Sequence, residues 1–220
     1  MFWKHFNIRF VAVFVGDAIP PKLNPYADNI ILWPYNTHLN SAYVAQNIRL
    51  YYPAMLELPE DEMVMITDMD MLPTSLDYYT GGLEQYTTRD FVYYRNVDEN
   101  QIYMCYNASH PTTWADLFSI RSLSDIEAQL NRHYDNGYNG IAGTTGWFTD
   151  QLVLYNTIIH YPHLHILERP IRRLEVGAYR YHLFQSDTNF IHRYDDVHFH
   201  RSYTKNAEFI LNAYSQLNYT

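Results

Sequence analysis

Two aspartates that lie one residue apart, Asp68 and Asp70, are the side chains best suited to do chemistry in this chain. They follow the apolar start of the segment 63–73, which predicts a buried strand that delivers both residues to the carboxyl edge of a sheet. Side chains two apart on a strand point the same way, and a divalent cation offsets the repulsion between two carboxylates. The pair predicts a metal site that can hold a diphosphate. The alternative is two loop carboxylates that cap a turn before Pro73.

A second group of metal-binding side chains lies near the end of the chain, at residues 195–200. If this segment is extended, Asp196, His198 and His200 share one face, while Val197 and Phe199 face the core. Imidazole and carboxylate together suit Mn²⁺ or Mg²⁺. We expect one histidine to complete the aspartate site, and the residues leave open whether it is His198 or His200. The alternative is a solvated strand edge with incidental histidines.

A candidate for acid–base chemistry is Asp150, which follows the glycine-rich segment 137–146. It is a candidate general base that would deprotonate the hydroxyl of an acceptor molecule. Trp147 would then be a platform for a sugar ring, and Gln151 would be a further contact with the acceptor. The alternative is that Asp150 merely begins a helix, because the helix dipole alone favours an acid there.

Arginines are the candidates for binding phosphate. Arg49 lies in a predicted helix and is assigned to a phosphate or base, although a solvated helix face explains it equally well. The cluster formed by Arg169, Arg172 and Arg173 is a second candidate for a diphosphate, with a charged surface loop as the alternative.

The elements that must position these residues follow an α/β pattern. Apolar periodicity and caps predict the following segments: strands at 9–15, 29–33, 91–94 and 102–106, a helix from a Ser41 cap to Tyr52, a helix from a capping box at 124–127 that stops near Gly137, a helix at 150–161 capped by Thr149, and a closing helix at 205–217. The segment 137–146 is predicted to be a mobile loop.

Composition sets the class of protein. The 220 residues are 47% hydrophobic and contain no linker, which predicts one domain over residues 1–220. The single cysteine, Cys105, excludes an internal disulfide and predicts a reducing compartment, the cytoplasm. The net charge of −9 argues against nucleic acid as the main partner, and no segment is apolar enough to span a membrane. The 22 tyrosines suit sugar rings, but core packing explains any single one.

The D-x-D pair, downstream of a strand that ends in Val15-Gly16-Asp17 and with a histidine-containing segment late in the chain, resembles a GT-A glycosyltransferase. The chain looks most like the small GT-A domains encoded by large DNA viruses, such as chlorovirus-like enzymes, which would place it in a host cytoplasm. The resemblance implies a Rossmann-like three-layer sandwich with a central mixed sheet. It also implies a nucleotide-sugar half at about 1–80, to which Gly16 and Arg49 contribute, and an acceptor half at about 81–220.

What the resemblance implies for the reaction is transfer of a sugar from a nucleotide-sugar, a UDP-sugar by default, to a hydroxyl of a glycan acceptor. Asp70 would bind Mn²⁺ or Mg²⁺ directly, Asp68 would contact the ribose or the metal through water, and His198 or His200 would be the late metal ligand. Asp150 falls where an inverting member often has its base, so inversion is expected.

One departure from the family concerns its first strand. Phe2 to Phe6 resembles the tail of the family's first helix and Arg9 to Val15 its second strand, so the expected fold lacks the first strand. Two other classes stay open. A phosphatase of the haloacid dehalogenase type would use Asp68 as nucleophile, with Asp195 and Asp196 at its Mg²⁺ site. A non-catalytic glycan-binding module would account for the tyrosines.

Overall fold

The chain folds into two compact units that interleave along the sequence. The computed structural model describes residues 3, 6–34, 38–95, 100–170, 172–176, 191–199, 207–208, 210–211 and 215. Unit 1 combines Met1–Phe10, Thr67–Gln85 and Arg169–Thr220, and unit 2 combines Val11–Ile66 and Tyr86–Glu168. These boundaries do not follow the predicted division near residue 80, and the division into a donor half and an acceptor half stays a prediction.

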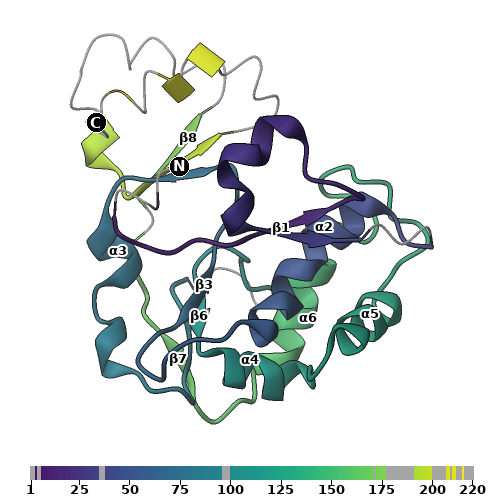
Figure 1. Cartoon of the computed structure of the whole chain (residues 1–220). Coiled ribbons are helices and arrows are strands. Elements are labelled where there is room, and N and C mark those ends of the chain that lie inside the picture. The colour runs from purple at the N-terminus through teal and green to yellow at the C-terminus, as the bar shows by residue number, and fades with distance from the viewer. Residues whose placement is uncertain are drawn as a thin grey trace. The chain divides into compact units, whose positions relative to one another are not determined.

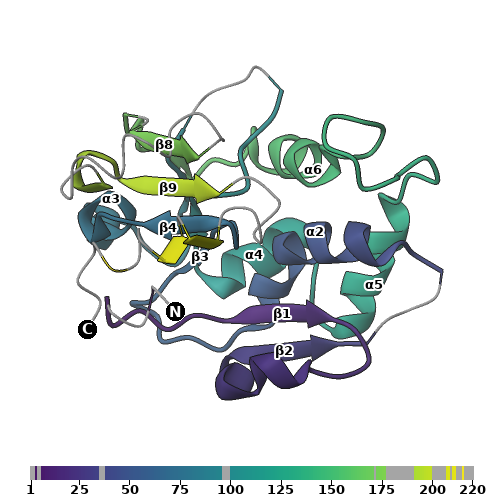
Figure 2. The ribbon, with the colours of Figure 1, turned by 90° about the horizontal axis from the view of Figure 1, so that it is seen from above.

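Unit 2 contains two sheets. The strands β1 (Ala12–Val15) and β2 (Ile30–Trp33) pair in parallel, and the connection between them contains the 3₁₀ helix η1 (Pro21–Asn29) (Figure 2). The second sheet has the order β3-β6-β5-β7, formed by β3 (Val64–Ile66), β6 (Asn107–Ser109), β5 (Phe91–Tyr93) and β7 (Leu164–Ile166). Since β6 is antiparallel to both neighbours and β5 is parallel to β7, the strands β3, β5 and β7 run in the same direction.

Most predicted strands of unit 2 are confirmed, and one is wrong. The strands predicted at 9–15, 29–33 and 91–94 correspond to β1, β2 and β5. The strand predicted at 102–106 instead lies at Asn107–Ser109, because Tyr106 has a φ of 88° that an extended strand cannot include. Tyr103 is exposed between the buried Ile102 and Met104, but Cys105 and Tyr106 are buried as well, so the alternation of a strand with one solvated face stops at Met104.

Four helices of unit 2 pack against one another (Figure 1). They are α2 (Ser41–Tyr51, continued by the 3₁₀ helix η2, Tyr52–Met55), α4 (Pro111–Phe118), α5 (Leu123–Arg132) and α6 (Thr149–Ile158). Their apolar faces build one core with the sheets, which includes Trp33, Tyr43, Ile48, Phe91, Trp114, Ile126, Leu154 and Ile158. Many tyrosines are part of this interior: Tyr43, Tyr51, Tyr93, Tyr94, Tyr106 and Tyr138 are buried.

The helices α2, α5 and α6 were predicted, but their caps differ. The side chain of Asn40, not Ser41, accepts from the N–H of Ala42 at 2.9 Å, and Ser122 rather than Ser124 caps α5. α5 ends at Arg132, before Gly137. Thr149 is the first residue of α6, and its hydroxyl donates to the carbonyl of Gly146 at 2.7 Å.

Unit 1 is built around a three-stranded mixed sheet of order β4-β9-β8 (Figure 2). β4 (Met71–Pro73) is antiparallel to β9 (Asp196–Phe199), which is parallel to β8 (Arg173–Val176). The helix α3 (Leu76–Thr80) and the 3₁₀ helices η3 (Leu83–Gln85) and η4 (Ile191–Arg193) complete the described elements. Of the closing helix predicted at 205–217, the described residues 207, 208, 210, 211 and 215 are helical, and the others lie outside the described residues.

At the level of fold class, the chain is α/β with mixed sheets, as predicted. No helix within the described ranges combines the length and apolar character needed to cross a membrane.

Candidate functional site

The two aspartates lie in a turn of unit 1, not on one strand as predicted. β3 ends at Ile66 and β4 begins at Met71, and the N–H of Met71 donates to the carbonyl of Asp68 at 3.3 Å. Both aspartates are half-buried, whereas Met69 between them is 92% exposed. The prediction failed because an apolar run interrupted by a short turn keeps the same hydrophobic pattern as one long strand.

The pairing of β4 with β9 brings Asp70 close to His198. Met71 lies opposite His198, and the N–H of Phe199 donates to the carbonyl of Asp70 at 2.8 Å. The Asp70 Oδ2 to His198 Nε2 distance is 3.5 Å. Two segments that the sequence singled out separately therefore meet in one place. The alternative histidine, His200, lies outside the described residues.

His198 lies between two carboxylates. Its Nδ1 is 2.6 Å from Oε2 of Glu175, which stands opposite it on β8. The carboxylates of Asp70 and Glu175 raise the pKa of His198 to about 9, against the opposing effect of burial. The side chains of His198 and Asp70 are 22% and 21% exposed, so they are partly screened from water yet accessible to a small ion.

Glu175 was missed by the sequence analysis. The segment 173–176, Arg-Leu-Glu-Val, alternates polar and apolar residues, which is the signal that places Arg173 and Glu175 on one face of a strand. Its partner could not be found this way, because the contact depends on the register between β8 and β9, and 23 residues separate Glu175 from His198.

The three arginines of the predicted cluster are engaged by groups of unit 1. Arg172 makes a bidentate pair with Asp195, at 2.9 and 2.7 Å. Arg173 Nε donates to the fully buried Asp196 at 2.9 Å. Arg169 donates to the carbonyls of Asp77, at 2.9 Å, and Gly81.

These pairs bear on two of the sequence interpretations. They favour a structural role for the arginine cluster over binding of a diphosphate. They also place both Asp195 and Asp196, the carboxylates that the phosphatase alternative needs for Mg²⁺, in ion pairs with arginine.

The donor types of the cluster formed by Asp70, His198 and, in the same turn, Asp68 fit the metal that the family resemblance implies. Mn²⁺ and Mg²⁺ take carboxylate oxygens, and Mn²⁺ also takes imidazole. Across the part of the chain that the structure describes, no three His, Cys, Asp or Glu side chains already stand in a metal-binding arrangement. The cluster therefore matches Mn²⁺ in its chemistry, and coordination would require its side chains to rearrange.

In unit 2 the structure brings together Asp150 and Arg49, which the sequence analysis had assigned to separate tasks. The Arg49 Nη2 to Asp150 Oδ2 distance is 2.8 Å, and the side chain of Asp150 is 0% exposed. The other oxygen, Oδ1, accepts from the N–H of Gln151 at 2.9 Å. Burial, followed by the Asp150 charge, raises the pKa of Tyr51. A buried and paired carboxylate of this kind offers no oxygen to an incoming hydroxyl unless the ion pair opens.

The remaining predicted residues also lie in unit 2. The carbonyl of the half-buried Trp147 accepts from Nε2 of Gln46. Oε1 of Gln151 is buried and has no hydrogen-bond partner within the described ranges. The N–H of Gly16 donates to the carbonyl of Trp33 at 2.9 Å, and a Cβ at Gly16 would lie 2.8 Å from the Phe14 ring.

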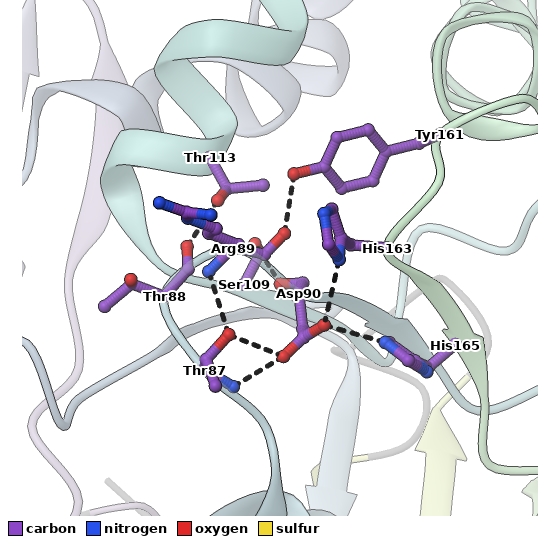
Figure 3. A network of polar contacts seen from close by, with 9 residues as sticks. All are labelled: Thr87, Thr88, Arg89, Asp90, Ser109, Thr113, Tyr161, His163 and His165. Atoms are coloured by element: carbon purple, nitrogen blue, oxygen red, sulfur yellow. Dashed lines mark hydrogen bonds and ion pairs between the residues drawn. The ribbon is translucent and has the colours of Figure 1, made fainter.

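A polar network around Asp90 was not predicted (Figure 3). The buried Asp90 accepts from the N–H and hydroxyl of Thr87, at 2.6 and 2.8 Å, and lies 2.7 Å from Nε2 of His165 and 4.0 Å from Nδ1 of His163. Ser109 Oγ donates to the Asp90 carbonyl at 2.7 Å. The two histidines flank Leu164, the alternation typical of a strand. The network links the starts of β5 and β7.

Comparison with known proteins adds no relative: no family model, no curated protein and no solved structure matches this chain.

Proposed function

We propose that this chain is a metal-dependent glycosyltransferase of GT-A-like fold, which moves a sugar from a nucleotide-sugar, by default a UDP-sugar, to a hydroxyl of a glycan acceptor. The observation that carries the proposal is the convergence of Asp70 and His198, 3.5 Å apart, at a half-buried position of unit 1. The D-x-D resemblance supplies the substrate class.

Asp70 and His198 are the residues that would hold Mn²⁺ or Mg²⁺, with Asp68 in the same turn. When bound, the cation supplies positive charge that stabilises the departing nucleoside diphosphate. The chain has a net charge of −9, so phosphate binding needs such local compensation. Within the described part of unit 1, Arg172 and Arg173 are engaged by Asp195 and Asp196, which favours the cation as the source of that charge.

The pairing of β4 and β9 is what prepares this site. The backbone bond from Phe199 to Asp70 fixes the end of the turn, and the register fixes His198 beside it. The carboxylate and the imidazole are thus held by a sheet on one side and by a turn on the other. The shared register limits how far the two side chains would have to rearrange, and with it the cost of ordering them when an ion binds.

The base in this proposal is not assigned to Asp150. For Asp150 to take a proton from an acceptor hydroxyl, its pair with Arg49 would have to open and expose a fully buried carboxylate. The stereochemistry of the transfer therefore has to be measured. Inversion at the anomeric carbon would indicate a single displacement assisted by a base.

The test combines metal binding with sugar transfer. Mn²⁺ binding by calorimetry and nucleotide release from a panel of nucleotide-sugars are measured for the wild type, Asp70→Asn and the matched control Asp77→Asn, an exposed aspartate of the same unit. We expect Asp70→Asn to lower kcat/KM on the order of 100-fold, because a metal contributes several kcal/mol to such reactions, and the control to retain activity.

Unchanged metal-dependent turnover in Asp70→Asn would contradict the proposal. Glycan binding without nucleotide binding by the wild type would support the non-catalytic module in its place.

A further inference from the structure

We infer that Glu175 is a positioning residue, whose carboxylate holds the imidazole of His198 so that Nε2 is the nitrogen presented to the cation beside Asp70. The inference rests on the proposed metal site and adds to it a residue that binds neither the metal nor the substrate.

The two ring nitrogens of His198 have different partners. Nδ1 lies 2.6 Å from Glu175 Oε2, which is a short hydrogen bond, whereas Nε2 lies 3.5 Å from Asp70 Oδ2. The parallel register of β8 and β9 places Glu175 directly opposite His198, so the contact is set by the backbone of the sheet.

The hydrogen bond selects one form of the ring. A carboxylate can only accept, so Nδ1 keeps its N–H toward Glu175. With a pKa of about 9 the metal-free ring carries a proton on both nitrogens, and a cation on the side of Asp70 would displace the proton of Nε2 while the proton of Nδ1 stays with Glu175. A carboxylate on the far nitrogen also raises the basicity of the coordinating one and fixes the plane of the ring, as outer partners of metal-bound histidines do.

Glu175 is itself held in place. Its second oxygen, Oε1, lies 3.8 Å from Nη1 of Arg173, and Arg173 is anchored through Nε to the fully buried Asp196. Tyr79 donates to the other oxygen of Asp196 at 3.4 Å. A half-exposed glutamate, 47% exposed, is thereby connected to the interior of unit 1 and keeps its orientation toward His198.

The first experiment measures Mn²⁺ affinity by electron paramagnetic resonance titration. The variants are Glu175→Ala, the isosteric Glu175→Gln, Asp70→Asn, and the control Glu84→Gln, an exposed glutamate of the same unit. We expect about 10- to 100-fold weaker binding for Glu175→Ala, the range typical of lost outer partners. Glu175→Gln should lose less, because its amide oxygen still accepts from Nδ1, and Glu84→Gln should bind as the wild type does.

The second experiment reads the ring directly. Proton–nitrogen NMR of ¹⁵N-histidine-labelled, metal-free protein should show a slowly exchanging, strongly downfield Nδ1 proton of His198 in the wild type, held by Glu175, and its loss in Glu175→Ala. A residue with only a structural role would change the melting temperature and leave this signature unaltered.

The outcomes separate the inference from the proposed function. If Asp70→Asn loses Mn²⁺ but Glu175→Ala and Glu175→Gln bind it as the wild type does, the role of Glu175 is refuted and the metal site stands. If the wild type binds no Mn²⁺, both are refuted. Because Glu175→Gln preserves shape, the comparison survives even if Glu175→Ala does not fold.

Discussion

Two ion pairs of unit 2 differ strongly in the exposure of their side chains. Asp150 and Arg49 form a pair in which the carboxylate is 0% and the guanidinium 27% exposed, while Asp116 and Arg121 form a pair that is 73% and 63% exposed. The same two chemical groups thus stand in very different dielectric surroundings, and their loss should have very different effects.

Removing Arg49 should destabilise the protein strongly. Arg49→Leu leaves the buried charge of Asp150 without its partner, and we expect the free energy of unfolding to fall by about 3–5 kcal/mol. Adding Asp150→Asn in the same chain should restore part of the loss, because no buried charge then remains. Urea unfolding followed by circular dichroism measures both.

The exposed pair is the matched control. Arg121→Leu should change the free energy of unfolding by less than about 1 kcal/mol. Asp150→Asn alone also distinguishes the two roles of Asp150: a structural residue lowers stability and leaves kcat of the folded fraction intact, whereas a general base lowers kcat about 100-fold or more. Equal effects of Arg49→Leu and Arg121→Leu would contradict the assignment of a buried pair.

Among the elements, β5 and β7 are joined by side chains as well as by backbone. The Asp90 network reaches from the turn before β5 to His163 and His165 at β7 (Figure 3). Burial alone would raise the pKa of Asp90, but the N–H and hydroxyl of Thr87 and the contact with His165 outweigh it, so the pKa is lowered. The folded state therefore binds this proton less readily than the unfolded state does.

The sign of the pH dependence follows. A carboxyl group whose pKa is depressed by folding contributes stability above its unfolded pKa, about 4, and loses that contribution as the pH falls through its folded value. Asp90→Asn should lower the free energy of unfolding by about 2 kcal/mol near neutral pH, in line with hydrogen bonds to a charged group. The difference from the wild type should shrink on acidification below about pH 4.

Urea unfolding at several pH values measures this, with Asp61→Asn, an exposed aspartate of unit 2, as control. The control should stay within about 0.5 kcal/mol of the wild type. A difference between Asp90→Asn and wild type that is constant from neutral to acid pH would show that the charge of Asp90 is not what stabilises β5 and β7.

Over the whole molecule, local patterns were predictable and long-range pairings were not. Apolar runs and turn residues located β1, β2, β5 and the helices α2, α5 and α6. The turn at Asp68 and Asp70 has the sequence pattern of a strand, because Met69 and Met71 continue the apolar alternation. Caps were displaced by one or two residues, since Asn40 and Ser41, like Ser122 and Ser124, carry the same capping chemistry.

Contacts between side chains that are distant in the sequence could not be predicted, for a different reason. The contacts of Glu175 with His198, of Arg49 with Asp150 and of Asp90 with His165 depend on which strands and helices are neighbours. A single sequence does not show the register between distant elements. The two units also interleave, so the chain passes from unit 2 to unit 1 between Ile66 and Thr67. The donor chemistry of the residues and the family resemblance both predict that a late histidine joins Asp70, but neither distinguishes His198 from His200.

The turn between the two aspartates carries its own chemical reporter. Met69 is 92% exposed and is the one exposed methionine of those that the structure describes, while Met71 and Met104 are buried. Mild peroxide should therefore oxidise the Met69 thioether first, and mass spectrometry would register the added oxygen on one peptide. A ligand that binds over this turn would slow the oxidation of Met69. Binding of the ligand can therefore be measured without any label, mutation or assay of turnover.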